Sequence, residues 1–376
     1  MQPSGERAWV VLHDGVRGFP VPARKKLGSA AEGIRGVHAS KLRTATTAGK
    51  RDRANRIGPP GEVLPPSCRA RMGAMTSFAH LPETIRLGDL EVFRLGFGAM
   101  QLPGPMVYGP PRDPAAARAV LRRVIDLGIN LVDTSWYYGP YVSNELIKEV
   151  LHPYKAGLVF ATKLGGRRTE DKGWASYLRP EELRKGCEED LRTLGRDHLD
   201  IVHLRWIPHG AAVTFGEALD AMIALKSEGK IRHLGLSNVT LAQIQEALRK
   251  TPIVTVENLY NAAASGEKLG QSFLGNTAGQ EEIVAFCTEH GIAYLPYFPL
   301  NVPGPGPVDR PVIRKIAAAR GVSETQVALA WLLARSPVIL PIPGTSTVAH
   351  LEDNWAARKL ALTRDEIAAI TEARKP

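Results

Sequence analysis

From Glu83 onward, hydrophobic and polar positions follow two alternating patterns along the chain. Short apolar runs predict buried strands, and the stretches between them, in which apolar residues return every three or four positions, predict amphipathic helices. Ahead of these units, the alternation in residues 83–98 predicts a hairpin that turns at Gly88 and Asp89. The predicted strands cover residues 96–100, 130–135, 158–163, 200–206, 231–238, 253–261, 292–300 and 338–344.

Strands that alternate with helices in this way predict a parallel sheet covered by helices. The number and spacing of these units favour a closed (β/α)8 TIM barrel, preceded by the short β-hairpin, over a doubly wound sheet. A doubly wound dinucleotide-binding domain would carry a GxGxxG turn after its first strand. The nearest stretch, LGFGAMQLPG at residues 95–104, does not match that pattern. We therefore predict that residues 76–376 form one barrel domain.

Residues 1–75 have no sustained strand or helix period and contain basic and proline-rich stretches such as KLRTATTAGKRDR. Such a segment buries too little apolar surface to offset its ordering entropy, so we predict a disordered basic tail. The methionines at 72 and 75 offer a second interpretation, in which the tail results from an upstream start. A transit peptide and a nucleic-acid-binding arm are further alternatives, but neither amphipathic periodicity nor interleaved aromatic residues support them.

Charge and cysteine content narrow the function classes. The tail holds 14 Lys or Arg and 5 Asp or Glu, so it carries 9 of the 10 net positive charges and the predicted barrel is almost neutral. We therefore expect no nucleic-acid partner for the barrel. Cys68, Cys187 and Cys287 have no metal-ligand spacing, which predicts no metal site and a reducing, cytoplasmic setting. No apolar run is long enough for a membrane span, so no membrane partner is expected.

Polar residues at the carboxyl ends of the strands carry the candidate chemistry, because barrel enzymes build their sites there. Lys163 closes an apolar strand and needs a counter-charge, which Asp133 at the end of the neighbouring strand supplies. A tyrosine beside that pair, its pKa lowered by the ammonium, is suited to give a proton to a carbonyl oxygen. A structural Asp–Lys pair with a packing tyrosine is the alternative interpretation of the same residues.

Four ordered motifs then identify a family. LVDTSWYYGPYVSNELI, VFATKLGG, IRHLGLSN and LPIPGTSTVAHLEDNWAA together resemble the aldo-keto reductases from about residue 93 to residue 359. The resemblance is to bacterial, pyridoxal-reductase-like members, and it implies catalytic roles for Asp133, Tyr138 and Lys163. Tyr138 is then the proton donor, Lys163 the group that lowers its pKa and Asp133 the partner of Lys163. Tyr137 is set aside, because the family places its tyrosine five residues after the aspartate.

The fourth catalytic position departs from the family pattern. Where the family has a histidine five residues after the aspartate of its strand, this chain has Arg205, and His203 lies two residues earlier. Strand alternation directs both side chains into the barrel. Arg205, nearer the rim, is able to orient a carbonyl oxygen or bind an anionic group. His203 is interpreted as a hydrogen-bonded interior histidine, with replacement of the usual catalytic histidine as its alternative role.

The resemblance also implies NADPH as the cofactor, with NADH as the alternative. Ser237 and Asn238 are assigned to the nicotinamide amide and Tyr297 to its ring, while Glu257 replaces the usual glutamine and accepts only from the amide NH₂. The remaining assignments lie on the segment after the last strand. Gly344, Thr345 and Ser346 meet the phosphates, His350 stands where some relatives grip the 2′-phosphate, and Asp353 and Asn354 meet the adenine end.

Three hypotheses of function follow. The leading one is an NADPH-dependent reductase of a small-molecule aldehyde or ketone, with pyridoxal or a secondary metabolite as candidate substrates. An NADPH-binding regulatory protein of the same fold with little turnover is the alternative, suggested by Arg205 and Glu257. A nucleic-acid-binding protein that uses the basic tail is the third. The substrate and the oligomeric state are not encoded in any pattern of the sequence.

Overall fold

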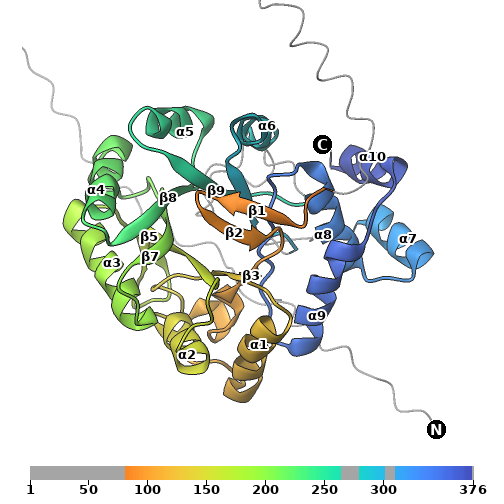
Figure 1. Cartoon of the computed structure of the whole chain (residues 1–376), viewed down its shortest axis with the longest axis horizontal. Coiled ribbons are helices and arrows are strands. Elements are labelled where there is room, and N and C mark those ends of the chain that lie inside the picture. The colour runs from red at the N-terminus through yellow and green to blue at the C-terminus, as the bar shows by residue number, and fades with distance from the viewer. Residues whose placement is uncertain (1–80, 264–278, 301–309, 375–376) are drawn as a thin grey trace, which may run out of the picture. The chain divides into compact units, whose positions relative to one another are not determined.

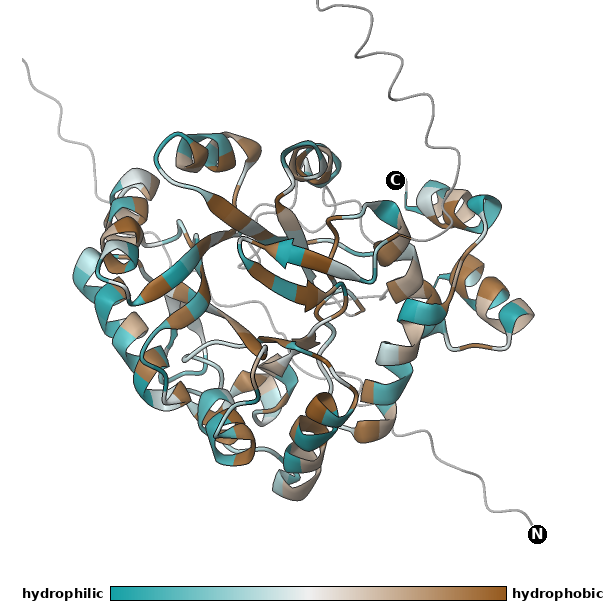
Figure 2. Cartoon of the chain, viewed as in Figure 1, coloured by the Kyte–Doolittle hydropathy of each residue, from teal (hydrophilic) through white to brown (hydrophobic). Residues whose placement is uncertain are grey.

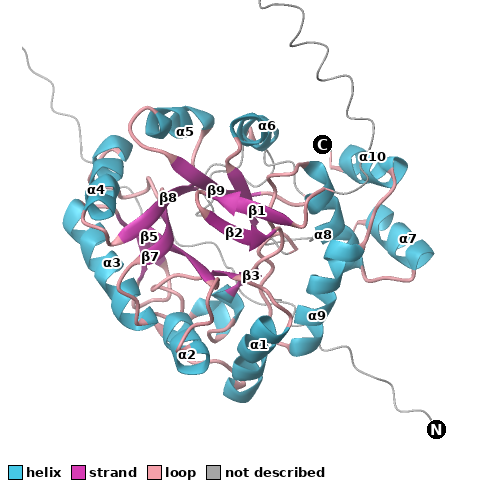
Figure 3. Cartoon of the chain, viewed as in Figure 1, coloured by secondary structure: helices cyan, strands magenta, loops and turns pink. Residues whose placement is uncertain are grey.

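The computed structural model describes residues 81–263, 279–300 and 310–374, all within one compact unit of the chain, residues 69–376. In this unit a curled parallel sheet lies inside a ring of helices, as Figures 1 and 3 show. The predictions for residues 1–75 lie outside the described residues.

Seven strands of the barrel are regular. Their order in the sheet is β10-β9-β8-β7-β5-β4-β3, and each neighbouring pair is parallel. The strands are β3 (Phe97–Gly98), β4 (Leu131–Asp133), β5 (Val159–Arg168), β7 (Leu199–Arg205), β8 (Ile231–Ser237), β9 (Ile253–Leu259) and β10 (Ala293–Tyr297).

The eighth predicted strand, residues 338–344, closes the barrel without forming a regular ladder. It bridges β10 through Tyr294 and Ile339 on one side and β3 through Gly98 and Gly344 on the other. Leu340 donates its N–H to the Tyr294 carbonyl, and Gly98 donates to the carbonyl of Pro343. Because the prolines at 341 and 343 have no N–H to donate, the ladder is interrupted. The predicted (β/α)8 barrel is confirmed, and the prediction of a regular eighth strand is wrong.

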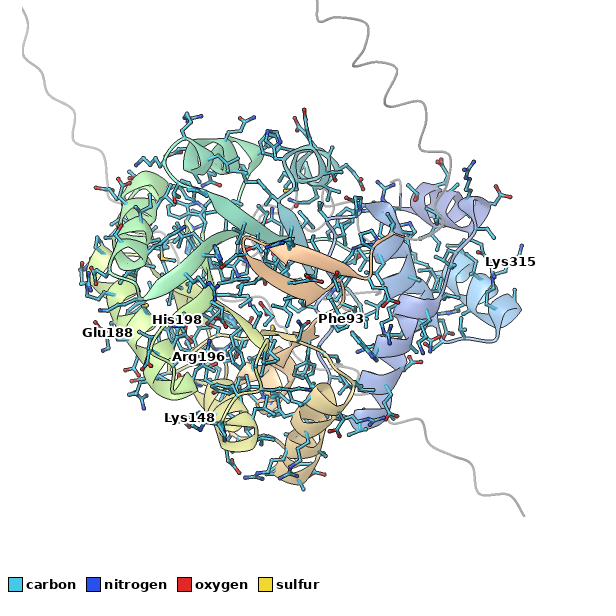
Figure 4. The ribbon with its side chains drawn as sticks, in the orientation of Figure 1. Phe93, Lys148, Glu188, Arg196, His198 and Lys315 are labelled. Atoms are coloured by element: carbon cyan, nitrogen blue, oxygen red, sulfur yellow. The ribbon has the colours of Figure 1, made fainter. Side chains whose placement is uncertain are left out.

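The helices form the outer layer, and each carries both apolar and polar residues (Figure 2). The exposed side chains of Lys148, Glu188 and Lys315 project from the outside of this layer (Figure 4). The helices are α1 (Pro114–Asp126), α2 (Val142–Leu151), α3 (Pro180–Leu194), α4 (Phe215–Ser227), α5 (Leu241–Leu248), α6 (Gln280–His290), α7 (Pro311–Arg320), α8 (Glu324–Arg335), α9 (Val348–Ala356) and α10 (Arg364–Ala373), with 3-10 turns η1 (Ala99–Gln101), η2 (Pro105–Val107) and η5 (Ala357–Lys359). None of the described helices is long and apolar enough to cross a membrane.

The N-terminal hairpin, β1 (Thr84–Leu87) and β2 (Leu90–Phe93), is present as predicted. Its buried Leu87 and Val92 pack against Leu131, Val159 and Ile201, which lie in the first half of their strands. The hairpin therefore covers the amino-terminal end of the barrel, and the site must lie at the carboxyl end.

One element was not predicted. The segment after the third predicted strand, expected to be a loop, continues β5 to Arg168 and returns as the antiparallel strand β6 (Trp174–Tyr177). The Arg168 guanidinium carbon lies 4.1 Å from the Trp174 ring centroid and 5.6 Å from that of Tyr108, which belongs to the loop after β3. With these contacts the basic segment forms a hairpin at the rim of the barrel.

Candidate active site

A pocket opens at the carboxyl ends of the strands, where the predicted catalytic residues meet. Its lining includes Gly98, Asp133, Tyr138, Glu257, Tyr297 and Gly344. These side chains come from opposite sides of the barrel, because β3, β4, β9 and β10 and the closing segment each contribute at least one. The pocket therefore exists only in the closed barrel.

At the floor of this pocket lies the predicted ion pair. Lys163 Nζ donates to Asp133 Oδ1 at 2.5 Å and to the Thr134 carbonyl at 3.3 Å, and the lysine side chain is fully buried. Burial lowers the pKa of the Lys163 ammonium, but the carboxylates of Asp133 and Glu257 hold that pKa well above its ordinary value. The pKa of Asp133 is raised to about 7. Burial is the largest cause and the charge of Glu257 acts in the same direction, whereas the Lys163 ammonium lowers this pKa. The predicted pairing is confirmed.

Tyr138 lies beside the pair, with Lys163 Nζ 5.4 Å from its ring centroid. The ammonium acts on the phenol in the expected direction, but burial is the larger effect and raises the pKa of Tyr138 above its ordinary value. The expectation of a lowered pKa is therefore wrong for this structure, because burial removes the water that would stabilise a phenolate. Tyr137 packs edge-on against Trp136, Tyr138 and Trp174, which suits a packing residue.

Strand β7 contributes two buried side chains, as strand alternation predicts. His203 Nδ1 lies 3.3 Å from the Thr162 carbonyl and its Nε2 lies 2.9 Å from Thr255 Oγ1. Burial is the largest effect on the pKa of His203 and the positive charge of Lys163 is the second, and the pKa falls to about 3. The imidazole is therefore neutral. This confirms the interpretation of His203 as a hydrogen-bonded interior histidine.

Arg205 lies one layer nearer the pocket mouth than His203. Its guanidinium carbon is 5.4 Å from the Tyr297 ring centroid, and the side chain is buried. Its Nε has no hydrogen-bond partner among the residues that the structure describes. The arginine therefore brings a buried positive charge and free donor capacity to the site.

Glu257 contacts Lys163, which the sequence analysis did not predict. Its side chain is buried, and its Oε2 lies 3.4 Å from Lys163 Nζ and 3.4 Å from His203 Nδ1. The carboxylate thus contacts Lys163 and also lines the pocket. Its position near the end of a predicted strand, two residues beyond Thr255 and on the same face, was the signal that would have found it.

Asp133, His203 and Glu257 also bring ligand atoms within 4.8 Å of one another, a spacing compatible with a cation. The Lys163 ammonium lies between the two carboxylates, 2.5 Å from one and 3.4 Å from the other. The positive charge at this position is therefore the lysine itself.

On the cofactor side, three predicted residues come together at the ends of β8 and β10. Tyr297 donates its hydroxyl hydrogen bond to Asn238 Oδ1 at 2.7 Å. The Asn238 Nδ2 and Ser237 Oγ atoms are buried and have no hydrogen-bond partner in the described part of the chain. A carboxamide, which has one acceptor and two donor hydrogens, matches these orphan groups.

The segment before α9 has the predicted capping chemistry. Thr347 is the N-cap of α9 and accepts from the His350 N–H at 3.3 Å, while Thr345 Oγ1 accepts from the Thr347 N–H at 3.2 Å. Gly344 lines the pocket and Ser346 is exposed beside it. A helix N-terminus with hydroxyl groups around it is suited to a phosphate.

Of the two residues assigned to the adenine end, Asp353 is half-buried and Asn354 is buried. Asp353 accepts from Ser323 Oγ and from Gln326 Nε2, both at 2.6 Å, and so it ties α9 to the start of α8. In this arrangement Asp353 is committed to the helix contact, and its assignment to adenine stays a prediction.

Together the fold and the site define a (β/α)8-barrel oxidoreductase. A model of the aldo/keto reductase family matches residues 94–304 and 309–375, and the chain belongs to that family. It is 44% identical over 291 residues to the pyridoxine 4-dehydrogenase of Escherichia coli (strain K12). The matched region covers 76% of this chain and 96% of that protein. It is 37% identical over 294 residues to an uncharacterized oxidoreductase of Schizosaccharomyces pombe, covering 78% and 90%.

A solved structure agrees with this assignment. The crystal structure of an aldo/keto reductase from Klebsiella pneumoniae in complex with NADP and acetate superposes with a TM-score of 0.62 at 26% identity. The match covers 78% of this chain and 96% of that one.

Proposed function

We propose that this protein reduces an aldehyde or ketone to an alcohol with NADPH as cofactor and Tyr138 as the proton donor. The observation that carries the proposal is the buried Asp133–Lys163 pair beside Tyr138 at the floor of the pocket. A proton donor must hold its proton at working pH, and burial acts in that direction because it raises the pKa of Tyr138. Lys163 then supplies the positive charge that stabilises the tyrosine as the proton leaves.

The chain's own residues fit the cofactor that the proposal needs. Ser237 Oγ and Asn238 Nδ2 offer unused polar atoms to the amide, Tyr297 lines the pocket, and Thr345 and Thr347 stand at the start of α9. When bound, reduced nicotinamide supplies the hydride that reaches the carbonyl carbon. The complex of the Klebsiella pneumoniae relative with NADP supports the phosphorylated cofactor, and NADH is the alternative to be compared in the same assay.

Arg205 takes the electrophilic role in this proposal. A guanidinium stays charged and cannot shuttle a proton, but its planar fork orients and polarises a carbonyl oxygen or an adjacent anionic group. The substrate that we favour is pyridoxal, in line with the similarity to a pyridoxine 4-dehydrogenase over most of both chains.

The test is NADPH oxidation with a panel that includes pyridoxal and 4-nitrobenzaldehyde, for the natural protein and for Tyr138→Phe. We expect turnover by the natural protein and a loss of about two orders of magnitude or more in the variant, the scale of removing a general acid. Tyr137→Phe is the matched control, because it removes a neighbouring phenol that packs against Tyr138, and it should retain most of the activity.

The regulatory alternative is favoured by one observation, the replacement of a titratable group by Arg205 at the fourth position. That alternative predicts NADPH binding, measured by fluorescence quenching, without oxidation by any carbonyl of the panel. Failure to bind NADPH would contradict both functions.

A further inference from the structure

The strand register places two buried charged residues, Arg205 and Glu257, at the same level of the sheet. Arg205 on β7 pairs with Ser237 on β8, and Ser237 pairs with Glu257 on β9. The three residues therefore occupy one level of three neighbouring strands, just above the level of Lys163 and His203. Arg205 is 8% exposed and Glu257 is 1% exposed, so water screens neither charge.

Glu257 also contacts Lys163, as Asp133 does. Lys163 Nζ is 2.5 Å from Asp133 Oδ1 and 3.4 Å from Glu257 Oε2. His203, the other neighbour of Glu257, is neutral because burial lowers its pKa to about 3. The site thus contains two cations, Lys163 and Arg205, and two carboxylates, Asp133 and Glu257.

A buried set of charges is tolerated when it is balanced, whereas one unbalanced charge in such a place is strongly destabilising. With a neutral side chain at position 257, Lys163 would have Asp133 alone and the charge of Arg205 would have no counter-charge on its own level. The Glu257 carboxylate meets both needs from a single position. A role limited to holding a nicotinamide amide does not require a second contact with the lysine.

We propose that Glu257 is a positioning residue of this site: it is the second counter-ion of Lys163 and it balances the charge of Arg205. This inference rests on the proposed reductase function for its kinetic consequence, but not for its structural one. The ionisable and charged groups that face or influence Glu257 are Asp133, Tyr137, Tyr138, Lys163, His203, Arg205 and Tyr297.

The kinetic test is the pH profile of kcat and kcat/KM for Glu257→Gln. Glu257 raises the pKa of Asp133, so removing its charge lets Asp133 ionise more readily. We expect the acid limb of the profile to move down by about one pH unit, the scale of a close charge on a carboxyl. Glu281→Gln is the control, because Glu281 also pairs with arginines, Arg335 and Arg374, but lies outside the pocket. Its acid limb should stay in place.

A second measurement does not depend on turnover. Thermal unfolding is followed for Glu257→Gln, Arg205→Met and the double variant. We expect the double variant to lose clearly less in Tm than the two single losses together, because it removes one charge of each sign. If Glu257→Gln does not fold and the double variant does, that result alone would show that the charges of Glu257 and Arg205 balance each other.

The outcomes separate the two proposals. Additive losses in Tm, or an acid limb that does not move, would overturn the role of Glu257 even if the natural protein reduces every aldehyde. If the natural protein oxidises no NADPH, the reductase function fails, and the unfolding cycle alone decides whether Glu257 balances Arg205.

Discussion

The Thr162 hydroxyl donates a hydrogen bond to Asp190 Oδ2 at 2.8 Å, and this bond ties α3 to the strand that carries Lys163. Asp190 Oδ1 accepts from Asn144 Nδ2 at 2.7 Å, and Asn144 Oδ1 accepts from Thr134 Oγ1 at 2.7 Å. Thr162 and Thr134 each adjoin a member of the Asp133–Lys163 pair. A fully buried polar network therefore fixes the end of β4 and the Thr162 position of β5 from outside the barrel.

This network predicts an unusual pH dependence of stability. Burial raises the pKa of Asp190 from 3.8 to about 7, so over that range the folded protein holds more protons than the unfolded chain. The free energy of unfolding therefore falls as the pH rises from about 4 towards 7. In Asp190→Asn this contribution is absent, so the stability of the variant relative to the natural protein should improve by about 2 kcal/mol between pH 5 and pH 8.

Urea unfolding at the two pH values measures this difference. Asp220→Asn serves as the control, since Asp220 is an exposed partner of Lys250 and its substitution should give the same difference at both pH values. A difference between Asp190→Asn and the natural protein that stays constant from pH 5 to pH 8 would refute the raised pKa of Asp190.

The helix caps allow a separate prediction about the cofactor end of the site. Thr347 caps α9, three residues after Gly344 of the pocket lining, and Thr363 caps α10 in the same way by accepting from the Glu366 N–H at 3.2 Å. Thr347→Val and Thr363→Val should each lose about 1 kcal/mol of stability, the usual cost of an N-cap. Only Thr347→Val should also weaken NADPH binding, because Gly344, Thr345 and Ser346, which are assigned to the phosphates, lie directly before this cap.

Equilibrium titration of NADPH fluorescence against the two variants checks this expectation, with urea unfolding as the measure of the lost cap. Equal NADPH affinity in both variants would place the phosphates away from the start of α9. A loss of affinity in Thr363→Val would instead point to a general loosening of the barrel.

The fold was predictable because each strand and helix carries its own periodic signal. Asp133 and Lys163 were predictable because they are polar residues that follow apolar runs on neighbouring strands. The contact of Glu257 with Lys163 was not, since it depends on the register of β9 against β5 through β8 and β7, which no local pattern specifies. Residues 338–344 were wrongly predicted as a regular strand because their apolar run resembles one. The two prolines in the run have no N–H for the hydrogen bonds between strands. The net direction of the Tyr138 pKa depended on burial, which the order of residues does not reveal.

A glycine within the barrel gives the last prediction. Gly235 on β8 lies level with His203 on one side and Thr255 on the other. A Cβ at this position would lie 2.2 Å from Thr255 Oγ1 and 2.5 Å from His203 Cδ2. These two side chains meet at 2.9 Å across the glycine, so an added methyl group must push apart a buried hydrogen bond.

Gly235→Ala should therefore lose about 3 kcal/mol, the upper range for overpacking a core. It should also lower turnover, because His203 Nδ1 is 3.4 Å from Glu257 Oε2, which contacts Lys163. Gly128→Ala is the matched control: Gly128 has a φ of +78° but open space around its Cβ position, so its cost is limited to backbone strain of about 1 kcal/mol. Urea unfolding and NADPH oxidation of both variants decide the matter. Equal losses of stability, or full activity in Gly235→Ala, would mean that the His203–Thr255 contact does not constrain the site.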